Sequence, residues 1–205
     1  GKLAREINKT EEMSINFMVV LEEISTAILD AVGDALRKSK VQIELLTLSE
    51  EDLRSSTDVF PIKFLDIKRN HVIYRGKDVV RDLEISRDNL RLRCEQEIKN
   101  LMLRLRLNYV SRKQNSKSIA SLLNKIYLSL IRNLGVLVEL KSGDVLVTNS
   151  DIIEGVSKLG IDIMALHDVE KLRQDKFSPE LEDRKRLLEK VMQCVRDAAI
   201  MADKL

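Results

Sequence analysis

The chain has 205 residues, of which 44% are hydrophobic and 33% charged, a balance typical of folded globular proteins and not of disordered ones. Its 35 basic and 33 acidic residues leave a formal net charge of +2, so the chain as a whole carries no strong field that would attract a polyanion. The 2 prolines, 7 glycines and low aromatic content favour helices over sheets.

The first part of the chain alternates strand and helix patterns. Ile15 to Leu21 is an apolar run of strand length, and Val41 to Leu46 alternates with the period of two that a half-buried strand shows. Between them, apolar residues recur at helical spacing from Ile24 to Leu36. We therefore expect a strand-helix-strand unit.

Shorter elements are predicted to follow this unit. The segment Thr47-Leu48-Ser49-Glu50 resembles a capping box, which predicts a short helix from Ser49 to Ser55. Pro61 suits the first turn of another helix, because the missing N–H would be unpaired there in any case. Val72 to Tyr74 predicts a brief strand, and the mixed α/β part is expected to end at Ile85.

From Ser86 onward the pattern is helical, interrupted by short polar segments. The predicted helices run from Ser86 to Val110, from Ile119 to Leu140, from a cap at Asn149 or Ser150 to Leu159, from Ile163 to Asp175, and from a Ser178 cap and Pro179 towards Leu205. This series predicts a helical bundle. The sequence thus divides into an α/β domain over residues 1–85 and a helical domain over residues 86–205.

Several short motifs in one order make this chain similar to a known family. They are Leu46-Thr47, Asp58-Val59-Phe60-Pro61, Phe64-Leu65-Asp66-Ile67, His71, Tyr74-Arg75-Gly76-Lys77-Asp78, Leu83-Glu84-Ile85, Leu90 to Glu97 and Leu103 to Arg106. They resemble bacterial and archaeal proteins that join a minimal nucleotidyltransferase domain, of the DNA polymerase beta superfamily, to a C-terminal helical domain. The resemblance implies an α+β fold: a small mixed sheet with flanking helices, followed by an all-α helical bundle.

The resemblance also implies where a metal-dependent site would lie. Such enzymes hold Mg²⁺ on carboxylates and bind a nucleoside triphosphate at a Gly-Ser turn, because the metals neutralise charge on the oxygens of phosphoryl transfer. The turn aligns with Gly1 and Lys2, where lysine replaces serine. Ser14 and Asn16 stand where two aspartates are expected and bring no negative charge for Mg²⁺. Glu44 is a candidate third carboxylate, although a solvated strand position is the simpler interpretation.

Three hypotheses follow from these residues. The first is a catalytically degenerate nucleotidyltransferase-like protein, with no metal site and no cofactor expected, that acts as a scaffold, by nucleotide binding, or through a protein partner or self-association. The alternative is an active enzyme that uses Mg²⁺ to move a nucleotidyl group from a nucleoside triphosphate to an unknown acceptor, with ligands at other positions or before Gly1. A second alternative is a helical oligomerisation module built on Ile119 to Leu140.

Other chemistries have weaker signals. Cys94 and Cys194 lie at helical spacing among apolar residues, which indicates reduced cysteines that pack in a core. Neither His71 nor His167 follows an arginine at the spacing of the ribonucleases that accompany some minimal nucleotidyltransferases. His167 beside Asp168 could transfer protons, but a solvated helix face is the simpler interpretation.

Basic residues are frequent between the two predicted domains. They are Arg87, Arg91, Arg93, Lys99, Arg104, Arg106, Arg112, Lys113 and Lys117. Acidic neighbours offset them and aromatic residues are few, so we interpret this segment as an exposed, salt-bridged helix, with nucleic-acid binding as the lesser interpretation. With no signal peptide and no apolar run of about 20 residues, we expect a cytoplasmic protein without membrane contacts.

Overall fold

The computed structural model describes residues 14–111, 115–176 and 178–205. This part of the chain contains a two-stranded sheet and eight helices, so the protein is mixed α and β. In chain order the elements are β1 (Ser14–Leu21), α1 (Thr26–Lys38), β2 (Gln42–Ser49), α2 (Glu50–Ser55), α3 (Pro61–Arg69), α4 (Arg87–Val110), α5 (Ser116–Ser142), α6 (Asn149–Lys158), α7 (Met164–Arg173) and α8 (Leu181–Ala202). None of these helices has the length and apolarity that a membrane span requires.

The chain divides into two compact units between Asn89 and Leu90. We call the part before this point the α/β unit and the part after it the helical unit.

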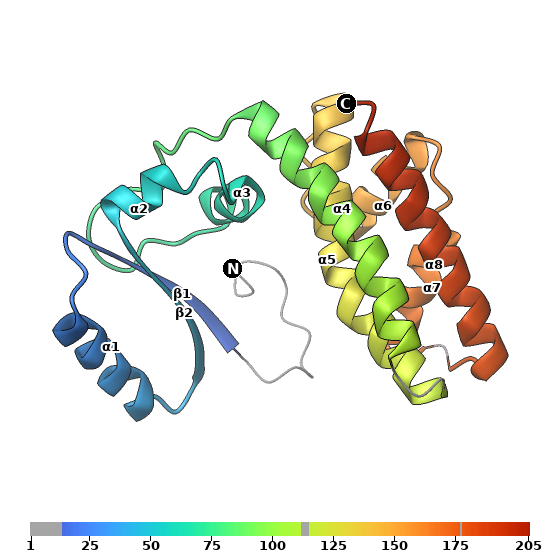
Figure 1. Cartoon of the computed structure of the whole chain (residues 1–205), viewed down its shortest axis with the longest axis horizontal. Helices are drawn as coiled ribbons and strands as arrows, with labels where there is room; N and C mark the ends of the chain where they lie inside the picture. Colours follow the sequence, from blue (N-terminus) through green and yellow to red (C-terminus); the bar gives the residue numbers. More distant parts are fainter. Residues whose placement is uncertain (1–13, 112–114, 177) are drawn as a thin grey trace. The chain divides into compact units, whose positions relative to one another are not determined.

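A parallel pair of strands forms the sheet of the α/β unit. β1 and β2 pair in register from Ser14 opposite Gln42 to Leu21 opposite Ser49, and α1 makes the connection that parallel strands require (Figure 1). The Ser25 side chain accepts a hydrogen bond from the Ile28 amide and so caps α1. The predicted strand-helix-strand unit is confirmed.

The third predicted strand is absent from the described residues. Val72 and Tyr74 are 85% and 88% exposed and lie in a loop, where no neighbouring strand supplies hydrogen bonds. The prediction of a strand from Val72 to Tyr74 is therefore wrong, and the described sheet is parallel and not mixed. The short apolar run resembles a strand, but burial and pairing decide whether one forms.

Three helix starts also differ from the predicted caps. In α2 the Ser49 side chain accepts from the Asp52 amide and the Asp52 carboxylate accepts from the Ser49 amide, both at 3.0 Å, so the acidic partner is Asp52 and not Glu50. Thr148, and neither Asn149 nor Ser150, caps α6. α8 begins at Leu181 and not at Ser178: Glu180 before it is extended, and the Arg184 side chain donates to the Pro179 carbonyl oxygen and the Ser178 hydroxyl.

The α/β unit has a small core on one face of its sheet. Leu53, Phe64, Val80 and Leu83 are buried together, and Met18, Val20 and Leu48 of the strands pack against them. α1 contributes no buried residue. The stability of this unit therefore depends on few side chains.

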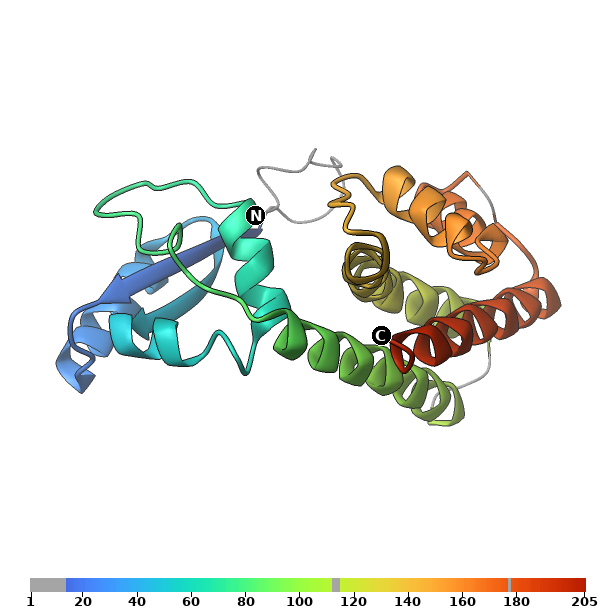
Figure 2. The same ribbon diagram turned by 90° about the horizontal axis from the view of Figure 1, so that it is seen from above.

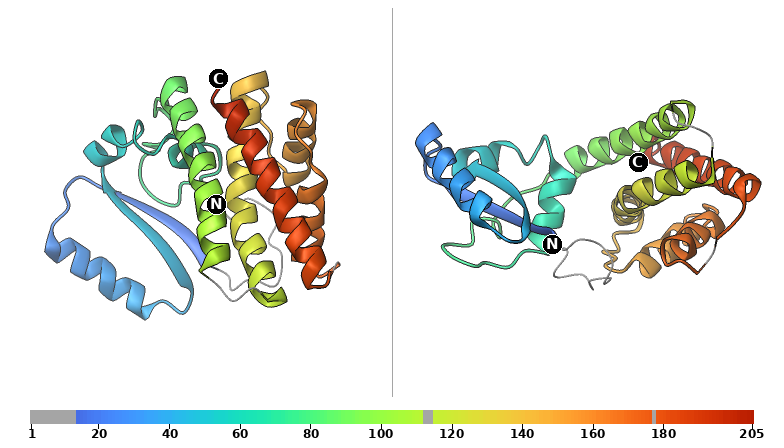
Figure 3. Two further views of the ribbon diagram at one scale, coloured as in Figure 1. Left: turned by 45° about the vertical axis from the view of Figure 1, so that its right-hand side comes forward. Right: turned by 90° about the horizontal axis from the view of Figure 1, so that it is seen from below.

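Helix α5 is the centre of the helical unit. Most of its residues are buried, and α6, α7 and α8 all pack against it, with α6 and α7 on one side and α4 and α8 on the other (Figures 2 and 3). Most apolar residues from Ile119 to Leu140 are thus used for packing within the chain.

Both cysteines pack inside the helical unit, as predicted. They are free and buried, and burial raises the pKa of each thiol to about 12. The Cys94 thiol donates to the Asn133 carbonyl oxygen at 3.6 Å, which joins α4 to α5. A thiol that stays protonated at neutral pH is a poor nucleophile and a poor metal ligand.

Candidate functional site

The candidate site in the α/β unit is the pair Asn16 and Glu44. They are register partners on β1 and β2, and both are exposed. Neighbouring strands lie about 5 Å apart, and residues paired in a parallel sheet project to the same face. This face is the one that carries Met18, Val20 and Leu48 further along the strands. The two side chains therefore lie side by side where the core face of the sheet opens to solvent.

This pair provides one carboxylate and one neutral amide. Position 14 lies two residues before Asn16 on β1, opposite Gln42, so the three positions suggested by the sequence meet at one end of the sheet. Gly1 and Lys2 lie outside the described residues. Across residues 14–111, 115–176 and 178–205, no three His, Cys, Asp or Glu side chains are grouped as metal ligands.

His71 and Asp78 form a contact that the sequence analysis did not identify. The Nε2 atom of His71 lies 3.1 Å from Asp78 Oδ1, and Nδ1 lies 3.1 Å from the carbonyl oxygens of both Ile67 and Lys68. All three neighbours are acceptors, so every contact is a hydrogen bond only when both ring nitrogens carry protons. We call this contact the His71–Asp78 clasp.

The clasp closes a loop that begins where α3 ends. Asp78 Oδ1 also accepts from the amides of Val80 and Arg81, at 3.2 and 3.0 Å. In the same loop, the Tyr74 ring meets the Phe17 ring of β1 edge-on, with ring centres 6.4 Å apart. The sequence signal for the clasp was a histidine and an aspartate on either side of an exposed Tyr-Arg-Gly-Lys turn.

Acid is expected to open the clasp. Burial acts to raise the pKa of Asp78, but hydrogen bonds from the Arg81 amide, the His71 ring and the Val80 amide outweigh it and lower the pKa below the ordinary value of 3.8. A lowered folded-state pKa gives stability that is complete above pH 3.8 and is lost as pH falls through the folded value. We therefore expect the Val80 and Arg81 amides to be protected from exchange, relative to their intrinsic rates at the same pH, at neutral pH and to lose this protection in strong acid.

The measurement is amide hydrogen exchange by NMR on the wild type and on Asp78→Ala. The variant should exchange these two amides faster at neutral pH, and the difference from wild type should vanish in strong acid. Asp82→Ala is the matched control, because Asp82 is exposed and makes no hydrogen bond to any described residue. Equal exchange in Asp78→Ala and wild type at neutral pH would show that the carboxylate does not hold the loop.

The remaining polar candidates have structural partners. Asp168 beside His167 forms an ion pair with Lys171 at 3.4 Å on α7, as the solvated-face interpretation expects. In the helical unit, a cavity of about 380 Å³ is lined by Ala120, Asn124, Leu172, Asp175, Ser178 and Arg184. The Arg184 guanidinium donates to the carbonyl oxygens of Pro179 and Ser116 at 2.7 and 2.8 Å, so this side chain fixes the chain at the start of α8.

The basic residues of α4 and α5 differ in their partners. On α4, Arg93 pairs with Glu97 at 2.7 Å, and Lys99 pairs with Glu95 and Asp203 at 2.6 and 2.9 Å. These pairs agree with the predicted salt-bridged helix. Arg104, further along α4, and Lys117 of α5, in contrast, form no ion pair with any residue that the structure describes.

Comparisons of the chain with protein-family models, with curated proteins and with solved structures find no match. The residues themselves are therefore the basis for assigning a function.

Proposed function

We propose that this chain is a catalytically degenerate, nucleotidyltransferase-like protein that acts through binding. In this proposal the α/β unit is a scaffold whose metal positions have lost their charge. The proposal rests on the resemblance of the motifs from Leu46 to Tyr109 and on the residues at the open end of the sheet.

The pairing of Asn16 with Glu44 is the observation that carries the proposal. It places the second aspartate position of the resemblance directly opposite the candidate carboxylate. A two-metal centre needs several carboxylates, because Mg²⁺ is bound through hard, anionic oxygens. A single carboxylate beside an amide supplies too little negative charge for that centre.

Restoring the charge should create a metal site. In Ser14→Asp/Asn16→Asp, three carboxylates would meet at the end of the sheet, and we expect Mn²⁺ binding with a dissociation constant of roughly 10⁻⁴ to 10⁻³ M, as in weak carboxylate sites. The wild type should give no saturable Mn²⁺ binding there and no transfer of label from a nucleoside triphosphate. Calorimetry and the electron paramagnetic resonance of free Mn²⁺ measure the binding.

Glu44→Gln provides the control in both backgrounds. Added to the double variant, it should abolish the new Mn²⁺ site, because it removes the one native carboxylate of the group. Persistence of Mn²⁺ binding would place the new site elsewhere and contradict the assigned positions. Label transfer by the wild type that is lost in Glu44→Gln would reject the proposal in favour of the active enzyme.

A further inference from the structure

Helix α5 exposes one narrow stripe to solvent. Between Ser116 and Arg132 its exposed residues are Lys117, Ser121, Lys125, Leu128 and Arg132. Successive members are three or four residues apart, so all five lie on one face of the helix. We call Lys117, Lys125 and Arg132 the α5 cationic stripe.

The stripe carries positive charge that no ion pair with a described residue balances. Every charged residue in the sequence between Glu97 and Glu139 is basic: Lys99, Arg104, Arg106, Arg112, Lys113, Lys117, Lys125 and Arg132. The stripe cations form no ion pair with a described residue, whereas cations on α6, α7 and α8 pair with acids three or four positions away. The small net charge of the whole chain therefore conceals a long segment in which every charged residue is basic.

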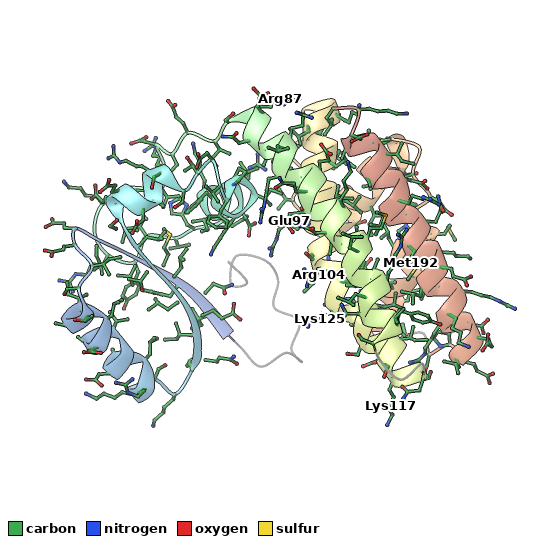
Figure 4. The ribbon with its side chains drawn as sticks, viewed as in Figure 1. Arg87, Glu97, Arg104, Lys117, Lys125 and Met192 are labelled. Atoms are coloured by element: carbon green, nitrogen blue, oxygen red, sulfur yellow. The ribbon has the colours of Figure 1, made fainter. Side chains whose placement is uncertain are left out.

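A cation from α4 adds to this surface. Arg104 lies on the same side of the helical unit as Lys125, as Figure 4 shows. Glu97 also projects there, but Arg93 neutralises it at 2.7 Å. The four cations Arg104, Lys117, Lys125 and Arg132 thus come from two helices that the Cys94 to Asn133 contact holds together.

The size of the stripe fits a polyanion. An α-helix rises 1.5 Å per residue, so Lys117 to Arg132 spans about 22 Å, with cations separated by roughly 10 to 12 Å. A small anion could meet one of these cations at a time. A nucleic-acid duplex carries a charge every 1.7 Å along its axis and can meet all of them together.

The residues between the cations indicate which kind of partner the stripe fits. Leu128 is the one large apolar side chain on the stripe, at 42% exposed, whereas a protein interface needs an apolar or aromatic centre. No aromatic residue lies among the five exposed positions, so single-stranded bases have no stacking platform. A membrane surface would need a continuous apolar face on the same side, and the large apolar residues of α5 other than Leu128 are buried in the helical unit.

We infer that the α5 cationic stripe, with Arg104, binds the phosphate backbone of double-stranded nucleic acid without reading its sequence. This binding does not require the proposed loss of catalysis in the α/β unit. If the metal and label-transfer experiments contradict the proposed function, the inference of duplex binding is unaffected. If the chain does not bind a duplex, the proposed function is unaffected.

The test is fluorescence anisotropy of the full chain with a labelled random-sequence duplex of about 20 base pairs, long enough to cover the stripe. Each neutralised phosphate contributes about −0.9 to the slope of log affinity against log salt concentration, so three stripe cations should cost roughly 40-fold in affinity between about 50 and 200 mM salt. Lys117→Gln/Lys125→Gln/Arg132→Gln should weaken binding and make the slope shallower by about one for each residue.

The matched control removes three cations from other faces. Lys158→Gln/Lys171→Gln/Arg186→Gln loses the same charge at exposed positions that form ion pairs within their own helices. It should leave the salt slope unchanged. Glutamine has nearly the helix propensity of lysine and arginine, so both triple variants should keep the wild-type circular dichroism and melting temperature.

Four results would overturn the inference. They are an absence of duplex binding by the wild type at low salt, equal weakening in the two triple variants, stronger binding to a single strand of equal length, and stripe-dependent binding to polyglutamate or anionic vesicles in preference to the duplex. Duplex binding that follows the stripe variant and shows no preference among duplex sequences supports it.

Discussion

Replacing Phe64 by alanine should unfold the α/β unit and leave the helical unit folded. Phe64 is 2% exposed at the centre of a core that contains few other buried side chains, namely Leu53, Val80 and Leu83. Truncation of a buried phenylalanine costs about 3–5 kcal/mol, because transfer energy is lost and a cavity remains. Since small domains are often stable by only about 5 kcal/mol or little more, this loss is close to the whole stability of the unit.

Two-dimensional NMR of the full chain would measure this outcome. Resonances of the α/β unit should collapse towards the positions of an unfolded chain, while those of the helical unit keep their dispersion. Val72→Ala is the control, because Val72 is 85% exposed and its truncation should change stability by less than about 0.5 kcal/mol. Collapse of every resonance in Phe64→Ala would mean that the two units fold as one.

Gly155→Ala should destabilise the helical unit, although alanine is the better helix former. A Cβ at Gly155 would lie 2.6 Å from Leu146 Cδ1 and 3.1 Å from Val138 Cγ1. Leu146 must move, and Val138 is a stiff, β-branched side chain buried on α5. Overpacking of this kind costs about 1–3 kcal/mol, which exceeds the gain of up to about 1 kcal/mol in helix propensity.

Gly33→Ala is the matched comparison on α1. There the new Cβ would meet Arg37 Nη1 at 3.2 Å, the end of an exposed and flexible side chain that can move aside. We expect this variant to stabilise the α/β unit by up to about 1 kcal/mol. Urea unfolding of both variants, monitored by NMR signals from each unit, gives the sign of the change in the free energy of unfolding for each substitution. Stabilisation by both substitutions would show that the close approach of α6 to α5 relaxes without cost.

Periodicity was sufficient to predict the main elements of both units. Apolar spacing located β1, α1 and β2, and it located α5 to within a few residues, because burial on one face leaves a repeat in the sequence. It could not predict the segment from Val72 to Tyr74, where a strand-like run has no partner strand among the residues that the structure describes. The predicted helix starts differ from the observed ones because several neighbouring hydroxyls and carboxylates compete for the same backbone amides.

The candidate site could be predicted in part. Ser14, Asn16 and Glu44 were identified from a family pattern, but their register depends on the crossover through α1, which spacing alone does not determine. The His71–Asp78 clasp was missed because its partners are joined by a loop without periodicity. The α5 cationic stripe was also missed, since its charge appears on one face only when the buried sides of α5 are known.

The burial of α5 on all but one face between Ser116 and Arg132 also has a consequence for how its sequence can vary. Packing restricts its interior positions to side chains of similar size, because well-packed cores tolerate neither cavities nor added volume. The five exposed positions between Lys117 and Arg132 are free of that restriction. Random drift would readily introduce acidic residues there, so a binding role for the stripe predicts that relatives of this chain keep those positions free of negative charge.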